Sequence, residues 1–186
     1  MGSPKKIRKK YETPEHPWRK ERIDAEKLLV EEYGLKNKTE VYKISSNLRS
    51  YFRQARSLIS SASAQAKKEE KQFLEKLYSL NLIQDRTMKV ENILNLNIKD
   101  LMERRLQTLI LKKGMAKSII QARQFIIHGH VFVDGKKVTV PSYLVRRNEE
   151  NQIIYDPVST LSSVNHPERV KMMAKETEAK ISLAKQ

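Results

Sequence analysis

Cysteine is absent from this chain of 186 residues. Its absence excludes disulfide bonds, thiol catalysis, iron–sulfur clusters and cysteine-ligated zinc, and is typical of a cytosolic protein. No stretch approaches the roughly 20 apolar residues needed to cross a bilayer, so we expect no membrane span. Apolar residues make up 39% and aromatic residues 6% of the chain. This composition predicts modest cores, with part of the stability supplied by a bound partner.

Acids are also scarce. The chain has 22 Asp and Glu against 37 Lys and Arg, which gives a net charge of +15. The imbalance is concentrated in residues 100–147, where ten bases oppose three acids and the net charge is +7. A second stretch, residues 41–68, contains no acid. Charge of one sign at this density indicates a polyanionic partner, which favours nucleic acid over an anionic membrane surface.

Four segments follow from the composition along the chain. Residues 1–17 form a basic arm in which prolines block a helix, and residues 18–98 form a helical domain. Residues 99–157 form a compact basic module, and residues 158–186 form a polar tail that is weakly helical or disordered. The arm has two interpretations, a solubilising tail or a segment that becomes ordered on RNA.

Within the helical domain, the spacing of apolar residues predicts helices over residues 18–33, 39–61 and 69–82. Gly34 suits the C-terminal end of the first helix, and Thr39 can cap the second. The module combines two helices with strands about Asp134-Gly135, a strong hairpin signal. The predicted elements of the module are helices over 100–113 and 118–128 and strands over 131–133, 137–140 and 153–155. The fold class is therefore α+β, with two helices packed on a short antiparallel sheet (an αL-type motif).

Three arginines, Arg49, Arg53 and Arg56, share one face of the second predicted helix, opposite its apolar stripe. They form either a phosphate-binding face or an ordinary solvated one. Because solvated faces usually mix signs and residues 41–68 contain no acid, the pattern favours phosphate contact.

The start of the second module helix combines Lys117 and Ser118 with unpaired backbone N–H groups. It lacks the glycines of a nucleotide-binding phosphate loop. Two interpretations remain, a binding site for one backbone phosphate and an ordinary capped turn.

His128 and His130 flank Gly129, and three roles are open to them: RNA contact, a structural role, or metal binding. Two histidines without a third ligand are weak grounds for a metal site. No Ser-His-Asp arrangement is present, and Glu103 beside Arg104 suits an ion pair better than catalysis. We therefore expect neither an enzyme, nor a cofactor, nor a small-molecule substrate.

These motifs carry a family resemblance. Arg104-Arg105-Leu106, the run from Gly114 to Arg123, the run from His128 to Val138, and Val140-Pro-Ser-Tyr143 occur in the order found in the S-four RNA-binding module. Residues 5–59 resemble the N-terminal part of the small-subunit ribosomal protein of that name, in its archaeal and eukaryotic form.

The resemblance implies a structural protein of the cytoplasmic small ribosomal subunit that binds 16S-type ribosomal RNA. Family members nucleate assembly of the subunit body at a multi-helix RNA junction. They lie near the channel through which messenger RNA enters, contact ribosomal protein five, and influence translational fidelity. The resemblance also implies that Asp134, where asparagine is usual, keeps the turn but stays away from RNA.

Carried over position by position, the resemblance implies RNA contacts at Arg104, Arg105, Lys117, Ser118, Gln121, Arg123, His128, His130 and Lys136. Charge adds Lys112 and Lys113 in the module, the three arginines of the helix face, and Lys5, Lys6, Arg8, Lys9 and Lys10 in the arm.

Three other classes of protein are less compatible with the sequence. A heat-shock or ribosome-recycling factor would need little beyond the module, and an RNA-modifying enzyme would need a catalytic domain for which no segment is free. A membrane-surface protein would expose a wide apolar face with aromatic anchors, whereas only Trp18 is available.

Overall fold

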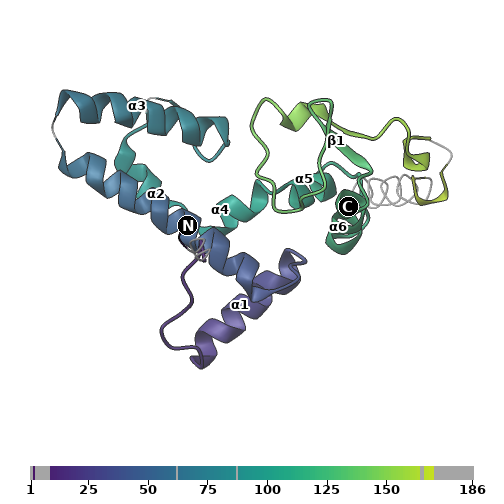
Figure 1. The fold of residues 1–186 in the computed structure, drawn as a ribbon, viewed down its shortest axis with the longest axis horizontal. Coiled ribbons are helices and arrows are strands. Elements are labelled where there is room, and N and C mark those ends of the chain that lie inside the picture. The colour runs from purple at the N-terminus through teal and green to yellow at the C-terminus, as the bar shows by residue number, and fades with distance from the viewer. Residues whose placement is uncertain (1, 3–8, 62, 87, 164–165, 170–186) are drawn as a thin grey trace, which may run out of the picture. The chain divides into compact units, whose positions relative to one another are not determined.

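The computed structural model describes residues 2, 9–61, 63–86, 88–163 and 166–169. Contacts divide the chain into two compact units (Figure 1). Unit 1 comprises residues 1–74 and 87–101, and unit 2 comprises residues 75–86 and 102–186. Residues 75–86, which the sequence placed with the helical domain, are thus grouped with the module. In the described residues, no helix has the length and apolar character required to span a membrane.

Unit 1 is built from helices around α2 (Lys38–Ser60). The other elements that contribute to it are α1 (Lys20–Glu32), the first part of α3 (Ala64–Ser79), the 3₁₀ helix η1 (Val90–Asn95) and the start of α4 (Ile98–Glu103). α2 packs against α1 and η1 through the predicted stripe, in which Val41, Ile44, Leu48 and Ala55 are buried. The apolar spacing therefore identified the buried face of α2 correctly.

The ends of α3 differ from the prediction for local reasons. The helix begins at Ala64 rather than residue 69, because Ser63 Oγ accepts the N–H of Ala66 at 3.1 Å, as a capping side chain does. It ends at Ser79 rather than residue 82, because Asn81 adopts a φ of +54° and the Leu82 N–H donates to the Leu77 carbonyl at 3.1 Å. The predicted Thr39 cap is wrong, since Asn37 occupies the N-cap of α2.

Unit 2 contains α5 (Leu106–Lys112), α6 (Ile119–Ile127) and a three-stranded antiparallel sheet in the order β2-β1-β3. The strands are β1 (Val131–Val133), β2 (Lys136–Lys137) and β3 (Ile153–Tyr155), with the short 3₁₀ helices η2 (Glu150–Gln152) and η3 (Thr160–Ser162) before and after β3. β1 lies between its neighbours with Phe132 opposite Lys137 and Ile154. The predicted α+β class is confirmed.

The hairpin between β1 and β2 turns at Asp134 and Gly135, whose φ angles are +52° and +69°. Positive φ at both central residues is the type I′ geometry that matches the twist of the strands. β2 is shorter than the predicted strand over 137–140, because the chain turns again where the Tyr143 N–H donates to the Val140 carbonyl at 3.2 Å.

The single helix predicted over residues 100–113 is wrong. α4 ends at Glu103 and α5 begins at Leu106, with Arg105 extended between them at φ −69° and ψ 141°. The break is held by backbone bonds to a distant segment, from the Leu106 N–H to the Tyr143 carbonyl at 2.8 Å and from the Val145 N–H to the Arg104 carbonyl at 3.0 Å.

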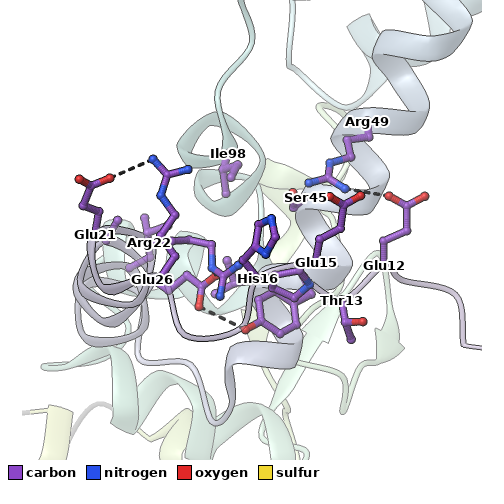
Figure 2. Close-up of a pocket in the computed structure, with 16 residues that line it drawn as sticks. Glu12, Thr13, Glu15, His16, Glu21, Arg22, Glu26, Ser45, Arg49 and Ile98 are labelled. Atoms are coloured by element: carbon purple, nitrogen blue, oxygen red, sulfur yellow. Dashed lines mark hydrogen bonds and ion pairs between the residues drawn. The ribbon is translucent and has the colours of Figure 1, made fainter.

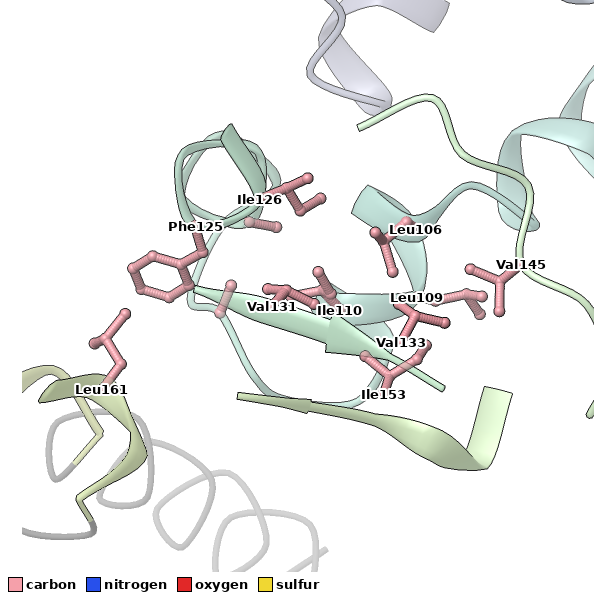
Figure 3. Close-up of a cluster of buried hydrophobic side chains, with 12 residues drawn as sticks. Leu106, Leu109, Ile110, Phe125, Ile126, Val131, Val133, Val145, Ile153 and Leu161 are labelled. Carbon is pink, nitrogen blue, oxygen red and sulfur yellow. The ribbon is translucent and has the colours of Figure 1, made fainter. Parts of the chain in front are cut away.

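The core of unit 2 lies between α5, α6 and the sheet (Figure 3). Ile110, Ile126, Val131 and Val145 have no exposed surface there. Leu161 in η3 is buried against the same cluster, so the described start of the tail belongs to this unit. The weak helix predicted further along the tail, beyond residue 169, lies outside the described residues.

Ile110→Ala should lower the free energy of unfolding by about 2–5 kcal/mol, because it leaves a cavity in this core. Ile120→Ala is the matched control, since Ile120 is 71% exposed on α6 and its truncation should change stability by less than about 0.5 kcal/mol. Urea denaturation of the two variants measures the difference. Equal effects of the two substitutions would contradict this description of the core.

Candidate nucleic-acid interface

Arg104 and Arg105 lie inside unit 2, although the sequence placed them on the RNA surface. Arg104 is 8% exposed and Arg105 is 1% exposed. Arg104 Nη2 donates to Glu150 Oε2 at 2.8 Å and to the Val145 carbonyl at 3.3 Å, while Arg105 Nη1 lies 3.9 Å from Met102 Sδ. Their contact with RNA stays a prediction, and their burial favours a structural role.

The turn between α5 and α6 forms the capped arrangement that the sequence left open. Ser118 Oγ accepts the N–H of Gln121 at 3.2 Å, and Gln121 Oε1 accepts the N–H of Lys117 at 2.8 Å. The start of α6 is thereby satisfied by two side chains from its own first turn.

A carboxylate lies beside this turn, at the position where the sequence suggested a phosphate. Glu168 Oε2 is 2.9 Å from Lys117 Nζ and accepts from Gln121 Nε2 at 3.0 Å. Glu168 lies 51 residues further along the chain than Lys117. An anion that binds Lys117 at this point must displace Glu168 or share the lysine with it.

Three predicted lysines of unit 2 are more exposed than Arg104 and Arg105. Lys112, Lys113 and Lys136 are exposed. Lys112 Nζ lies 3.1 Å from Glu103 Oε2 in a pair that is half exposed, and Lys113 Nζ donates to the backbone carbonyl of Glu150. Exposed pairs contribute less than about 1 kcal/mol. These ammonium groups can therefore exchange their protein partners for phosphates at little cost.

The two histidines have different surroundings. His128 follows α6 and is exposed, whereas His130 is partly buried with its Nδ1 2.8 Å from Ser159 Oγ and its ring edge-on to Phe125. These contacts favour a structural role for His130 and leave His128 facing solvent. Across the ranges that the structure describes, no cluster of three His, Asp or Glu side chains could hold a metal ion.

Arg123, the remaining predicted residue of the module, is partly buried. Its Nη1 donates to Gln107 Oε1 at 3.4 Å, and Gln107 Nε2 donates to the Ile119 carbonyl at 2.9 Å. The Arg123 side chain therefore contacts Gln107, whose own amide contacts the backbone of α6.

In unit 1, Arg49, Arg53 and Arg56 are all exposed on α2, as the predicted face requires. Glu12 of the arm lies against this face, with its carboxylate 2.7 Å from Arg49 and 4.0 Å from Arg53, and its N–H donates to Ser46 Oγ at 3.0 Å. Figure 2 shows the Arg49–Glu12 pair. The acid partner of the arginine face thus comes from the arm and not from α2.

Lys9 and Lys10 of the arm line a small cavity of about 220 Å³ together with Arg49 and Arg53. Basic residues from the arm and from α2 therefore lie close together. The other predicted arm contacts, Lys5, Lys6 and Arg8, lie outside the described residues.

A larger cavity of about 870 Å³ lies between the arm, α1 and α2 (Figure 2). Its wall carries both signs of charge, because Arg22 pairs with Glu26 at 3.0 Å and Tyr42 donates to the same carboxylate at 3.2 Å. Burial, together with the Glu26 carboxylate, raises the pKa of Tyr42 above its ordinary value. The mixed charge of this cavity does not suit a polyanion.

Comparison with known proteins gives a family-model match and several close relatives. The S4 domain family model matches residues 104–151, which lie in unit 2. Small ribosomal subunit protein uS4 of Methanococcus maripaludis strain C7 is 47% identical over 178 residues, which cover 96% of this chain and 100% of the relative. The uS4 protein of Methanococcus aeolicus is 49% identical over 171 residues, covering 91% of this chain and 96% of the relative.

The chain belongs to the uS4 family of small ribosomal subunit proteins. The resemblance seen in the sequence is thereby confirmed. Because the likeness extends over the full length of uS4 relatives, it covers the helical unit as well as the S4 domain. uS4 proteins are ribosomal proteins rather than enzymes, as the sequence predicted.

Arg105→Ala should lower the free energy of unfolding by roughly 2 kcal/mol or more, because it removes a buried charged side chain together with its hydrogen bonds. Arg56→Ala is the matched control, since Arg56 is exposed on a helix and its removal should have an effect within about 0.5 kcal/mol. Thermal and urea denaturation measure both. If the Arg105→Ala variant were fully stable but bound RNA more weakly, Arg105 would be an RNA contact and not a structural residue.

Proposed function

We propose that this chain is a structural constituent of the small ribosomal subunit and binds its 16S-type ribosomal RNA on the cytoplasmic ribosome. The observation that carries the proposal is the full-length likeness to uS4 proteins. The S4 domain match on unit 2 and the net charge of +15 support it, because a polyanion neutralises charge that the protein cannot pair internally.

The distribution of cations suggests how the chain holds RNA. Unit 2 offers exposed lysines around α5, the α5–α6 turn and the β1–β2 hairpin, and unit 1 offers the arginine face of α2. Cations of this kind bind phosphates and fix the register of folded RNA without reading its sequence. A chain with one such surface on each unit ties two RNA segments together, which is a structural role rather than a catalytic one.

The finer part of the proposal concerns where on the subunit this happens. We infer that the chain nucleates assembly of the subunit body at a multi-helix RNA junction. We further infer that it contacts ribosomal protein five and contributes to translational fidelity near the channel for messenger RNA. The family resemblance supports these points. RNA crosslinking with sequencing from native lysate tests them, since one small-subunit junction should dominate the RNA crosslinks and protein five should appear among the protein crosslinks.

Affinity for small-subunit ribosomal RNA should fall steeply with salt. About six phosphate contacts would lose on the order of a thousandfold in affinity between 50 and 200 mM salt, because each contact releases condensed counterions. Filter binding or fluorescence anisotropy over a salt series measures the slope, with an unrelated folded RNA of equal length as the control. An affinity that is nearly independent of salt, or equal for both RNAs, would contradict the proposal.

Glu168→Gln should tighten RNA binding about two- to fivefold at low salt, because it removes the carboxylate that neutralises Lys117. Glu31→Gln is the matched control, since Glu31 is exposed on α1 and its loss changes the net charge equally. In a Lys117→Gln background the gain from Glu168→Gln should disappear. An equal gain from both Glu→Gln variants would show that only net charge matters.

A further inference from the structure

A tyrosine near the end of α3 carries two arginines over its ring. The guanidinium carbons of Arg86 and Arg147 each lie 4.6 Å from the centroid of the Tyr78 ring. All three residues belong to unit 2, although 69 positions in the chain separate Tyr78 from Arg147. None of the three was among the RNA contacts expected from the sequence.

The backbone around the stack holds these residues in place. The Arg147 N–H donates to the Ser79 carbonyl at 2.7 Å, which ties the loop after residue 145 to the last turn of α3. On the other side, Asn81 adopts a φ of +54° and reverses the chain, so that the segment leading to Arg86 returns to the ring. The stack is therefore positioned by a backbone bond at Arg147 and by the turn at Asn81, as well as by side-chain contact.

The charges in the stack are not balanced by the protein. Both guanidinium groups are exposed and lie within about 9 Å of each other, a distance at which like charges repel. In the part of the chain that the structure describes, neither forms an ion pair with a carboxylate. Arg146 adds a third exposed cation, but its Nε lies 3.9 Å from Glu149 Oε1, so this arginine has a carboxylate partner that Arg86 and Arg147 lack in the described residues.

We infer that Arg86 and Arg147, held on Tyr78, form an additional site for the phosphate backbone of RNA. The inference rests on the proposed function and extends its RNA surface to the segment 75–86. A guanidinium that lies over an aromatic ring still presents its N–H edges, which suit the oxygens of a phosphate. Because the ring restricts both side chains before RNA arrives, less entropy is lost on binding.

The site reads backbone and not bases. Two guanidinium groups lie 4.6 Å from the centroid of the Tyr78 ring and occupy space that a stacked base would need. Phosphate contacts position RNA without carrying sequence information. Substitutions in the stack should therefore weaken binding to different RNA segments by similar factors.

Arg86→Gln/Arg147→Gln in the full chain should weaken binding to a small-subunit ribosomal RNA fragment about tenfold at 100 mM salt and reduce the slope of log affinity against log salt by about 1.4 to 1.8. Lys20→Gln/Lys27→Gln is the matched control, because both lysines are exposed on α1 and the loss of charge is equal. The control should stay within about twofold of the parent protein. Tyr78→Phe, which keeps the ring, should bind like the parent.

A second experiment measures the accessibility of the two arginines in the parent protein, without any substitution. Labelling with phenylglyoxal, read by mass spectrometry on the parent chain with and without RNA, should show Arg86 and Arg147 protected in the complex. Unchanged labelling of both arginines, together with parental affinity and salt slope for the double variant, would overturn the inference while the parent still binds RNA.

Failure of the parent chain to prefer small-subunit RNA would instead overturn the proposed function itself. If the double variant bound RNA normally but lost an acidic ribosomal protein from reconstituted subunits, the site would belong to that protein and the assignment to RNA would be wrong.

Discussion

A short exchange of backbone hydrogen bonds between residues 104–106 and 143–145 sets the arrangement of unit 2. It requires extended backbone at Arg105, and for that reason α4 stops at Glu103 and α5 starts afresh at Leu106. The new start turns Leu106, Leu109 and Ile110 toward the sheet and α6, where they are buried. Arg104 and Arg105 lie at the same break and are buried there. The break therefore accounts both for the start of α5 and for the absence of these two cations from the surface.

The remaining cations are held near carboxylates that come from elsewhere in the chain. Glu12 lies against the arginine face of α2, and Glu168 lies against Lys117 at the start of α6. Both pairs are at least partly open to solvent and contribute little to stability. These pairs limit the repulsion among the cations of this chain, and breaking them requires no rearrangement of the core.

Local patterns in the sequence were sufficient for the buried stripe of α2, the extent of α6 and the hairpin at Asp134-Gly135, since each depends on residues close together in the chain. They missed local details such as the ends of α3 and the cap of α2, and they failed for the break between α4 and α5 and for the acid partners of the cations, where the deciding residue is distant. Nothing near Arg105 indicates that Tyr143 and Val145 will interrupt its helix. The acids beside Arg49 and Lys117 lie 37 and 51 residues away, respectively. Charge density therefore predicted the class of partner, whereas long-range pairing determines which cations face it.

Two Arg-Arg pairs in unit 2 show why that distinction cannot be drawn from residue type. Residues 104–105 and 146–147 lie on the two segments that meet at the bridge, yet the first pair is buried and the second exposed. The Arg104 guanidinium donates to Glu150 and to the Val145 carbonyl, whereas the Arg147 guanidinium contacts the ring of Tyr78 and no carboxylate of the described residues. The Glu150 carboxylate offsets the cost of burying the Arg104 guanidinium, whereas the Tyr78 ring leaves the N–H edges of Arg147 in solvent. The second pair is for that reason better placed to meet a phosphate.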